Sequence, residues 1–184
     1  MPNPTLQMAA DNAFPPYSIR RLAAQDAEAF SFLRREVTAQ NPVQMGVTYE
    51  EELTRPLNGF REQLSFAEPN AVFGAFAATE LVGTAAVAWP SRRPSSCHKV
   101  NLWGVFVSPR YRARGIGRAL VETAVAHAWA NGARRVSLTV FVPNDPAIKL
   151  YESLGFEHCG MEPEAVLIGE TYHDGYLMSC RNKG

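Results

Sequence analysis

The chain has 184 residues, of which 46% are hydrophobic and 20% charged, a composition typical of one globular domain with a full core. Its 18 basic and 18 acidic side chains cancel, so no global charge attracts nucleic acid or an anionic membrane. The three cysteines form no CxxC pair, which argues against a disulfide framework or a metal site and favours a reducing compartment. No apolar run approaches the ~18 residues that span a bilayer, and we expect a cytoplasmic protein.

The N-terminal part begins with a proline-rich stretch, residues 1–16, that predicts a flexible tail. A single domain is expected over residues 17–184. Alternating side chains predict its first strand over residues 17–22. A helix is predicted over residues 27–39, with Asp26 as its N-cap.

A proline pattern shapes the next segment. Asn41-Pro42 ends the first helix, because the residue before a proline disfavours helical geometry. A second helix is predicted over residues 48–64, where Thr48 and Glu51 have the spacing of a capping box. Pro56 falls inside it, so we expect a kink or a division there.

The remainder of the chain alternates apolar strands with helices. A hairpin is predicted around Thr79-Glu80, and Ser108-Pro109 ends the third core strand. Asp145-Pro146 resembles an N-cap followed by proline at the first helical position. The predicted strands are residues 71–77, 81–89, 100–107, 135–142 (buried and central), 156–161 and 175–180, and the predicted helices are residues 118–130 and 145–154.

The most informative segment, residues 112–117, joins a strand to a helix. It reads Arg-Ala-Arg-Gly-Ile-Gly, so two glycines let a ligand approach the backbone closely. The N-terminus of a helix attracts anions through unpaired N–H groups and the helix dipole. Arg112, Arg114 and Arg118 can add charge-assisted hydrogen bonds. The segment therefore predicts a site for a phosphorylated ligand.

These residues resemble those of the GCN5-related N-acetyltransferase (GNAT) superfamily. The run Val105-Phe106-Val107-Ser108-Pro109, followed by residues 112–117, matches the family's R/Q-x-x-G-x-G/A turn. The paired N-terminal helices place residues 41–52 where the family covers its acceptor site. A second block follows roughly thirty residues later and consists of Asn144, Ala147, Leu150, Tyr151 and Gly155-Phe156.

The resemblance implies a mixed α/β fold with six or seven twisted strands, about four helices, and two central strands that splay beside a bulge. It also implies acetyl-CoA as the cofactor and CoA as the product. The backbone of Val105, Phe106 and Val107 is expected to pair with the pantetheine arm. The other residues expected to bind the cofactor are Arg112, Ala113, Arg114, Gly115, Ile116, Gly117, Arg118 and Asn144.

The activity implied is direct acetyl transfer to the primary amine of a small molecule, a peptide or a protein. Tyr151 matches the family's general acid, and a backbone N–H near Val107 is the expected oxyanion donor. Many members carry a glutamate as general base where this chain has Trp103. The base therefore stays open between a water chain and five side chains, His98, Glu162, Glu170, His173 and Asp174.

Several alternatives remain open at this stage. Residues 41–52, 90–98 and 163–174 combine aromatic and acidic side chains and are expected to face a cationic amine. Covalent transfer through Cys97 or Cys159 is a minor alternative, because neither has a histidine partner in a motif. An acyl-CoA sensor without turnover and a different nucleotide-binding enzyme are the rival functions. GNAT members are often dimers, so a homodimer is also open.

Overall fold

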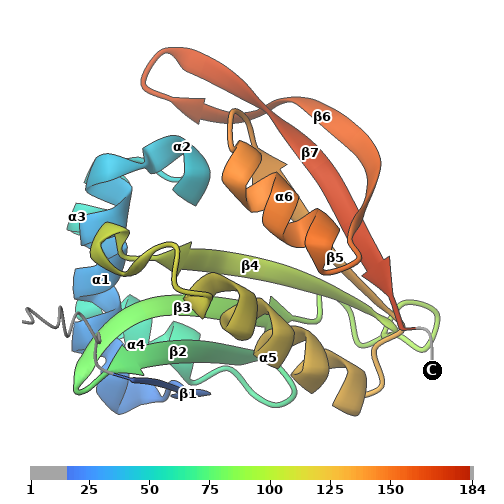
Figure 1. Cartoon of the computed structure of the whole chain (residues 1–184), viewed down its shortest axis with the longest axis horizontal. Helices are drawn as coiled ribbons and strands as arrows, with labels where there is room; N and C mark the ends of the chain where they lie inside the picture. The colour runs from blue at the N-terminus through green and yellow to red at the C-terminus, as the bar shows by residue number, and fades with distance from the viewer. Residues whose placement is uncertain (1–15, 183–184) are drawn as a thin grey trace, which may run out of the picture.

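The computed structural model describes residues 16–182, which form one seven-stranded sheet in the order β1-β2-β3-β4-β5-β7-β6 (Figure 1). Neighbouring strands are antiparallel except β4 and β5, which are parallel. The mixed, seven-stranded sheet confirms the predicted fold class. The strands are β1 (Tyr17–Arg21), β2 (Ala71–Ala77), β3 (Glu80–Ala88), β4 (Lys99–Val107), β5 (Arg135–Phe141), β6 (Glu157–Ile168) and β7 (Thr171–Arg181).

The described residues contain six α-helices rather than about four, because two prolines divide the N-terminal pair. Pro42 ends one helix but begins another, and Pro56 separates two more. Thr48 and Glu51 form the expected capping box. None of these helices is long and apolar enough to cross a membrane. The helices are α1 (Ala27–Gln40), α2 (Pro42–Met45), α3 (Tyr49–Thr54), α4 (Leu57–Leu64), α5 (Ile116–Ala130) and α6 (Asp145–Ser153).

The sheet separates two hydrophobic clusters. The first joins α5 and α6 to the strands, with Leu120 and Val136 fully buried, and the second packs Phe30 and Phe60 of α1 and α4 against β2–β4. Strand β5 contributes every second residue to the first cluster, while Ser137 and Thr139 on its other face are at least partly exposed. The prediction of a buried β5 therefore holds for one face. We call the other face, over β5 and β7, the open face.

The two central strands separate soon after they begin. Strand β4 pairs with β5 only from Lys99 to Asn101, after which no pairing joins them. A bulge follows on β4, where two residues, including Gly104 with φ of +60°, oppose the single Ala85 of β3. The Thr84 hydroxyl donates to the Gly104 carbonyl at 2.8 Å and holds the bulge in place. The splay beside a bulge is confirmed.

Several local predictions need correction. The hairpin turn is Ala78-Thr79, one residue earlier than predicted, since Glu80 already pairs with Ala77. Helix α6 has Asn144 as its N-cap, which moves Pro146 to the second helical position. Strands β6 and β7 extend well beyond the predicted pair and form a long hairpin, so residues 163–174 are mostly strand rather than loop.

Asp26 also differs from its predicted role. Its side chain makes no capping hydrogen bond to α1. Instead, the carboxylate accepts from the Ala23 N–H at 2.9 Å and from both terminal nitrogens of Arg20 at 2.8 and 2.7 Å. The Arg20 hydrogen bonds, followed by the Ala23 N–H, hold the pKa of Asp26 below its usual value. Asp26 thus joins β1 to the start of α1.

Asp26→Asn should lower the free energy of unfolding at pH 7 by about 0.5–1 kcal/mol, a small value because Arg20 is half exposed. Because the folded-state pKa is depressed, this stabilisation exists above the unfolded pKa of about 4 and is lost as pH falls through the lower folded value. Urea unfolding at pH 7 and pH 2 measures the difference. A difference that stays equally large at pH 2 would contradict the ionic explanation.

Candidate active site

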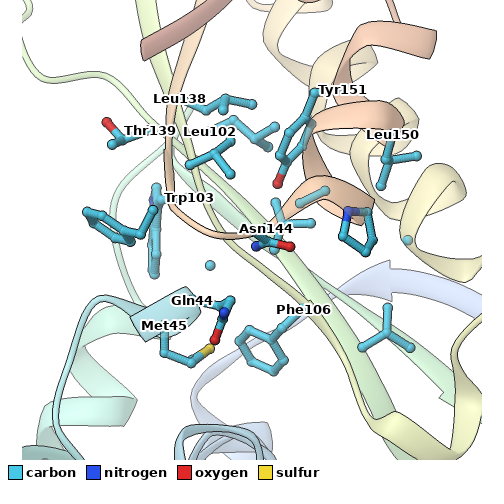
Figure 2. Close-up of a pocket in the computed structure, with 18 of the residues that line it drawn as sticks. Gln44, Met45, Leu102, Trp103, Phe106, Leu138, Thr139, Asn144, Leu150 and Tyr151 are labelled. Atoms are coloured by element: carbon cyan, nitrogen blue, oxygen red, sulfur yellow. The ribbon is translucent and has the colours of Figure 1, made fainter. Parts of the chain in front are cut away.

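The splayed strands open into a cavity of about 1340 Å³. The unpaired parts of β4 and β5 form its walls, α1 and α2 lie on one side, and α6 with the start of α5 lies on the other (Figure 2). Because β4 has no partner beyond Asn101 on this side, the backbone from Val105 to Val107 borders the cavity. All three residues predicted to pair with a pantetheine arm line it.

The turn after β4 reaches the cavity as predicted. Ala113 and Gly115 have positive φ of 60° and 76°, and a Cβ built on Gly115 would meet no atom within 4 Å. The first intrahelical bond of α5 joins the Ala119 N–H to the Gly115 carbonyl at 3.0 Å. The N–H groups of Ile116 and Gly117 precede that ladder, and both residues line the cavity. This arrangement is suited to a bound anion.

The three arginines of the turn have different surroundings. Arg112 lines the cavity and donates from Nε to the Val107 carbonyl at 3.1 Å, which ties the turn to the end of β4. Arg118 also lines it and donates to the Ser153 hydroxyl at 2.6 Å, joining α5 to α6. Arg114 is not on the cavity wall, and its guanidinium lies 5.3 Å from the centre of the Tyr111 ring. Two of the three predicted arginines therefore face the cavity.

Tyr151 and Asn144 both line the cavity. Figure 2 shows the Tyr151 hydroxyl pointing from α6 into the cavity toward Asn144. Tyr151 is 7% exposed, and its ring packs against the Phe156 ring with 5.6 Å between the two ring centres. Burial raises the pKa of the Tyr151 hydroxyl well above its usual value of 10, so it keeps its proton at neutral pH. Asn144 uses its backbone carbonyl to begin α6, and its side chain makes no capping bond.

Helix α2 bridges the two halves of the splayed sheet, a feature not predicted from the sequence. The Gln44 side-chain amide donates to the Pro143 carbonyl at 3.2 Å. Gly46 ends α2 with φ of +65°, and a Cβ there would lie 2.5 Å from the Phe141 ring. Figure 2 shows Gln44 and Met45 on the side of the cavity opposite Tyr151. A proline at the first helical position and a glycine after the last were the signals for this helix.

None of the five candidate bases lines the cavity. Among residues 16–182, the lining includes no histidine and one carboxylate, Asp145. His98 lies before β4, where its carbonyl accepts from the N–H groups of Arg134 and Arg135 at 2.9 and 3.1 Å. The others belong to the β6–β7 hairpin: Glu162, Glu170, His173 and Asp174. The structure therefore does not bring any of the five side chains suggested from sequence to the cavity wall.

The segments predicted to face an acceptor have mixed outcomes. From residues 41–52 the cavity receives Asn41, Gln44, Met45 and Val47, but residues 90–98 and 163–174 do not reach it. Two of the three acidic residues of the first segment serve the fold, since Glu51 caps α3 and Glu52 forms a buried ion pair with Arg34. Cys97 is also remote, whereas Cys159 lines the cavity and its thiol contacts the Leu177 carbonyl at 3.3 Å.

The comparison with known families decides the relationship. Residues 30–156 match the model of the acetyltransferase (GNAT) family, and this range includes the turn, Asn144 and Tyr151. The chain belongs to the GNAT family. GNAT proteins also provide its structural neighbours: an acetyltransferase of the GNAT family from Streptococcus pneumoniae has a TM-score of 0.76 at 25% identity, covering 91% of this chain and all of that one.

Two further GNAT relatives differ in what they share with this chain. A GNAT superfamily phosphinothricin acetyltransferase from Sinorhizobium meliloti, solved in complex with AcCoA, has a TM-score of 0.75 at 22% identity. The superposition covers 90% of this chain and 88% of that chain, and the likeness is one of fold. The L-amino acid N-acetyltransferase AaaT of Escherichia coli is 36% identical over 90 residues, 48% of this chain. The chain spans about half the length of AaaT, 54%, and less of the next curated relatives.

Proposed function

We propose that this GNAT protein is an N-acetyltransferase that moves the acetyl group of acetyl-CoA directly to a primary amine. The observation that carries the proposal is one cavity that joins an anion-binding helix N-terminus, an unpaired strand edge and a buried tyrosine. We also take residues 17–184 as a single acetyltransferase domain. The three free cysteines are consistent with a cytoplasmic location.

Binding of acetyl-CoA divides between two parts of the cavity. The N–H groups of Ile116, Gly117 and Arg118 would hold the pyrophosphate, with Arg112 and Arg118 adding positive charge. The open backbone edge at Val105, Phe106 and Val107 would pair with the amides of the pantetheine arm, as an added strand would. Asn144 would add a side-chain contact beside Tyr151. Arg114 and Ala113 would act by shaping the turn.

Acetyl-CoA supplies an activated thioester. The neutral amine nitrogen would form a bond to the acyl carbon, and the bond from that carbon to sulfur would break, giving an N-acetyl amide and CoA. The proton that the nitrogen loses would pass through water and replace the one that Tyr151 gives to sulfur. Tyr151 holds a proton for the departing sulfur, because burial keeps its hydroxyl neutral. The backbone N–H near Val107 would stabilise the carbonyl oxygen as it gains charge. The acceptor would approach from the open face, because α5 and α6 cover the other face.

The first experiment is thermal unfolding with acetyl-CoA, CoA, NADH and ATP. A ligand that binds only the folded state at a hundredfold excess over its Kd stabilises the protein by about 2.7 kcal/mol. We expect acetyl-CoA and CoA to raise Tm, and NADH and ATP to leave it unchanged. Absence of any shift in a folded sample would overturn the proposal. A shift without acetylation of an amine panel would favour the acyl-CoA sensor.

A further inference from the structure

A row of three cations crosses the end of the sheet where β4 and β5 are still paired. Lys99 of β4 lies opposite Arg135 of β5, and Arg135 lies opposite Arg181 of β7. Directly opposed residues share one face of a sheet. Their neighbours Val100, Val136 and Cys180 are buried in the core, so the three cations lie on the open face. This end of the sheet lies where β7 ends and β4 begins in Figure 1.

Few acidic side chains lie near these three cations to neutralise their charge. Within residues 16–182, no carboxylate lies within ion-pair distance of Lys99, Arg135 or Arg181. Arg135 donates to the Ser179 hydroxyl at 2.9 Å, and its buried Nε has no hydrogen-bond partner. Glu157 is the nearest acid by register, since it lies opposite Ser179 on the edge strand. The row therefore presents three like charges side by side, which is unfavourable unless an anion binds there.

A polar path connects this row to the cavity. Asn101 and Ser137 are paired with each other two residues beyond Lys99 and Arg135, and both line the cavity. Thr139 and Trp103 follow at the level where the strands have separated, and they also line it. Because side chains alternate, these residues lie on the open face with the cation row. The path thus runs along the open face from the row to the centre of the cavity.

The length of the path defines what can occupy it. Arg135 and Thr139 are four residues apart on β5, about 13 Å at 3.3 Å per residue. An extended peptide covers that distance with about four residues. The polar floor would hydrogen-bond a peptide backbone, and the row would bind a carboxylate.

We propose that the acceptor is the N-terminal amine of a peptide or protein with acidic side chains at about its fourth and fifth residues, held by Lys99, Arg135 and Arg181. This inference rests on the proposed acetyltransferase function and adds the acceptor class to it. The charge row selects the acceptor, while the turn and Tyr151 serve acetyl-CoA. The acceptor proposal can therefore be wrong while the acetyltransferase proposal is right, and the experiments distinguish the two cases.

The test compares two hexapeptides with free N-terminal amines and amidated C-termini, differing only in Asp or Asn at positions four and five. Fluorescence anisotropy of C-terminally labelled peptides, with CoA present, gives Kd without requiring turnover. We expect the Asp peptide to bind roughly five- to tenfold tighter at low salt, as a few partly exposed charge pairs would produce. The preference should shrink at 0.3 M salt. The ratio of kcat/KM for the two peptides should show the same preference.

The double variant Lys99→Gln/Arg181→Gln should reduce the preference to about twofold or less. Arg135 is left in place because it also bonds Ser179. Arg61→Gln/Arg110→Gln is the matched control, because it removes the same net charge from exposed positions outside the row, and it should retain the preference. Equal binding of the two peptides, binding of neither, or an unchanged preference in the double variant would overturn the proposal. Thermal stabilisation by acetyl-CoA on the same samples reports separately on the acetyltransferase proposal.

Discussion

Tyr151→Phe is expected to lower kcat by about a hundred- to a thousandfold while changing the affinity for acetyl-CoA by no more than about twofold. The loss follows from the typical contribution of a positioned general acid. Affinity should persist because phenylalanine keeps the ring that packs on Phe156. Steady-state kinetics with saturating acetyl-CoA, together with thermal stabilisation by CoA, separates the two effects.

The pH dependence of the reaction rate is a second test of the role of Tyr151. Burial raises the pKa of its hydroxyl above the usual 10, so the wild-type rate should not fall through loss of this proton below pH 10. Tyr17→Phe is the control, because Tyr17 lies on the edge strand β1, away from the cavity, and this variant should retain wild-type kcat. Unchanged kcat in Tyr151→Phe, or a large loss of cofactor affinity with normal turnover, would reassign Tyr151 to a structural or binding role.

Gly117→Val is expected to weaken acetyl-CoA binding by at least about a hundredfold, roughly 2.7 kcal/mol, while the protein remains folded. A Cβ at position 117 would lie 3.6 Å from Leu150 and 3.8 Å from Val107, which is ordinary contact, so the fold accepts it. Both neighbours line the cavity, and the added methyl groups would occupy the space that a phosphate needs. Thermal shift titration with CoA measures the change.

Ala126→Val is the matched control for Gly117→Val. It introduces the same β-branched side chain at an exposed position of α5, away from the main cavity, and so reports any effect of a valine on the helix alone. We expect its CoA titration to match that of the wild type. If Gly117→Val also binds CoA normally, the pyrophosphate does not lie at this turn.

The turn from β4 into α5 could be predicted because its signals are local. Glycines, arginines and a helix start are adjacent in the sequence, and the structure has them adjacent in space. The capping box at Thr48 and the division at Pro56 follow from equally short patterns. Such features depend on backbone geometry within a few residues, which the side chains specify directly.

Other features depend on partners that are distant in the sequence. Pro163 indicates a loop, yet it lies in the β6–β7 hairpin, since an edge strand such as β6 tolerates proline. The bulge at Gly104 requires knowledge of its register with Ala85. His98 precedes Trp103 by five residues, about 16 Å along a strand, so proximity in sequence did not place it at the cavity.

The splay of β4 and β5 has a cost for the protein without its ligand. A sheet ordinarily has two edges, but here two further edges lie inside the molecule, because the pairing stops after Asn101 and Ser137. Proteins protect exposed strand edges, which otherwise template aggregation. In the binding mode that we propose, a pantetheine arm would pair with the inner edge of β4 and cover it. A supply of the cofactor would then act as a small-molecule chaperone for the fold, and its depletion would favour self-association through β4.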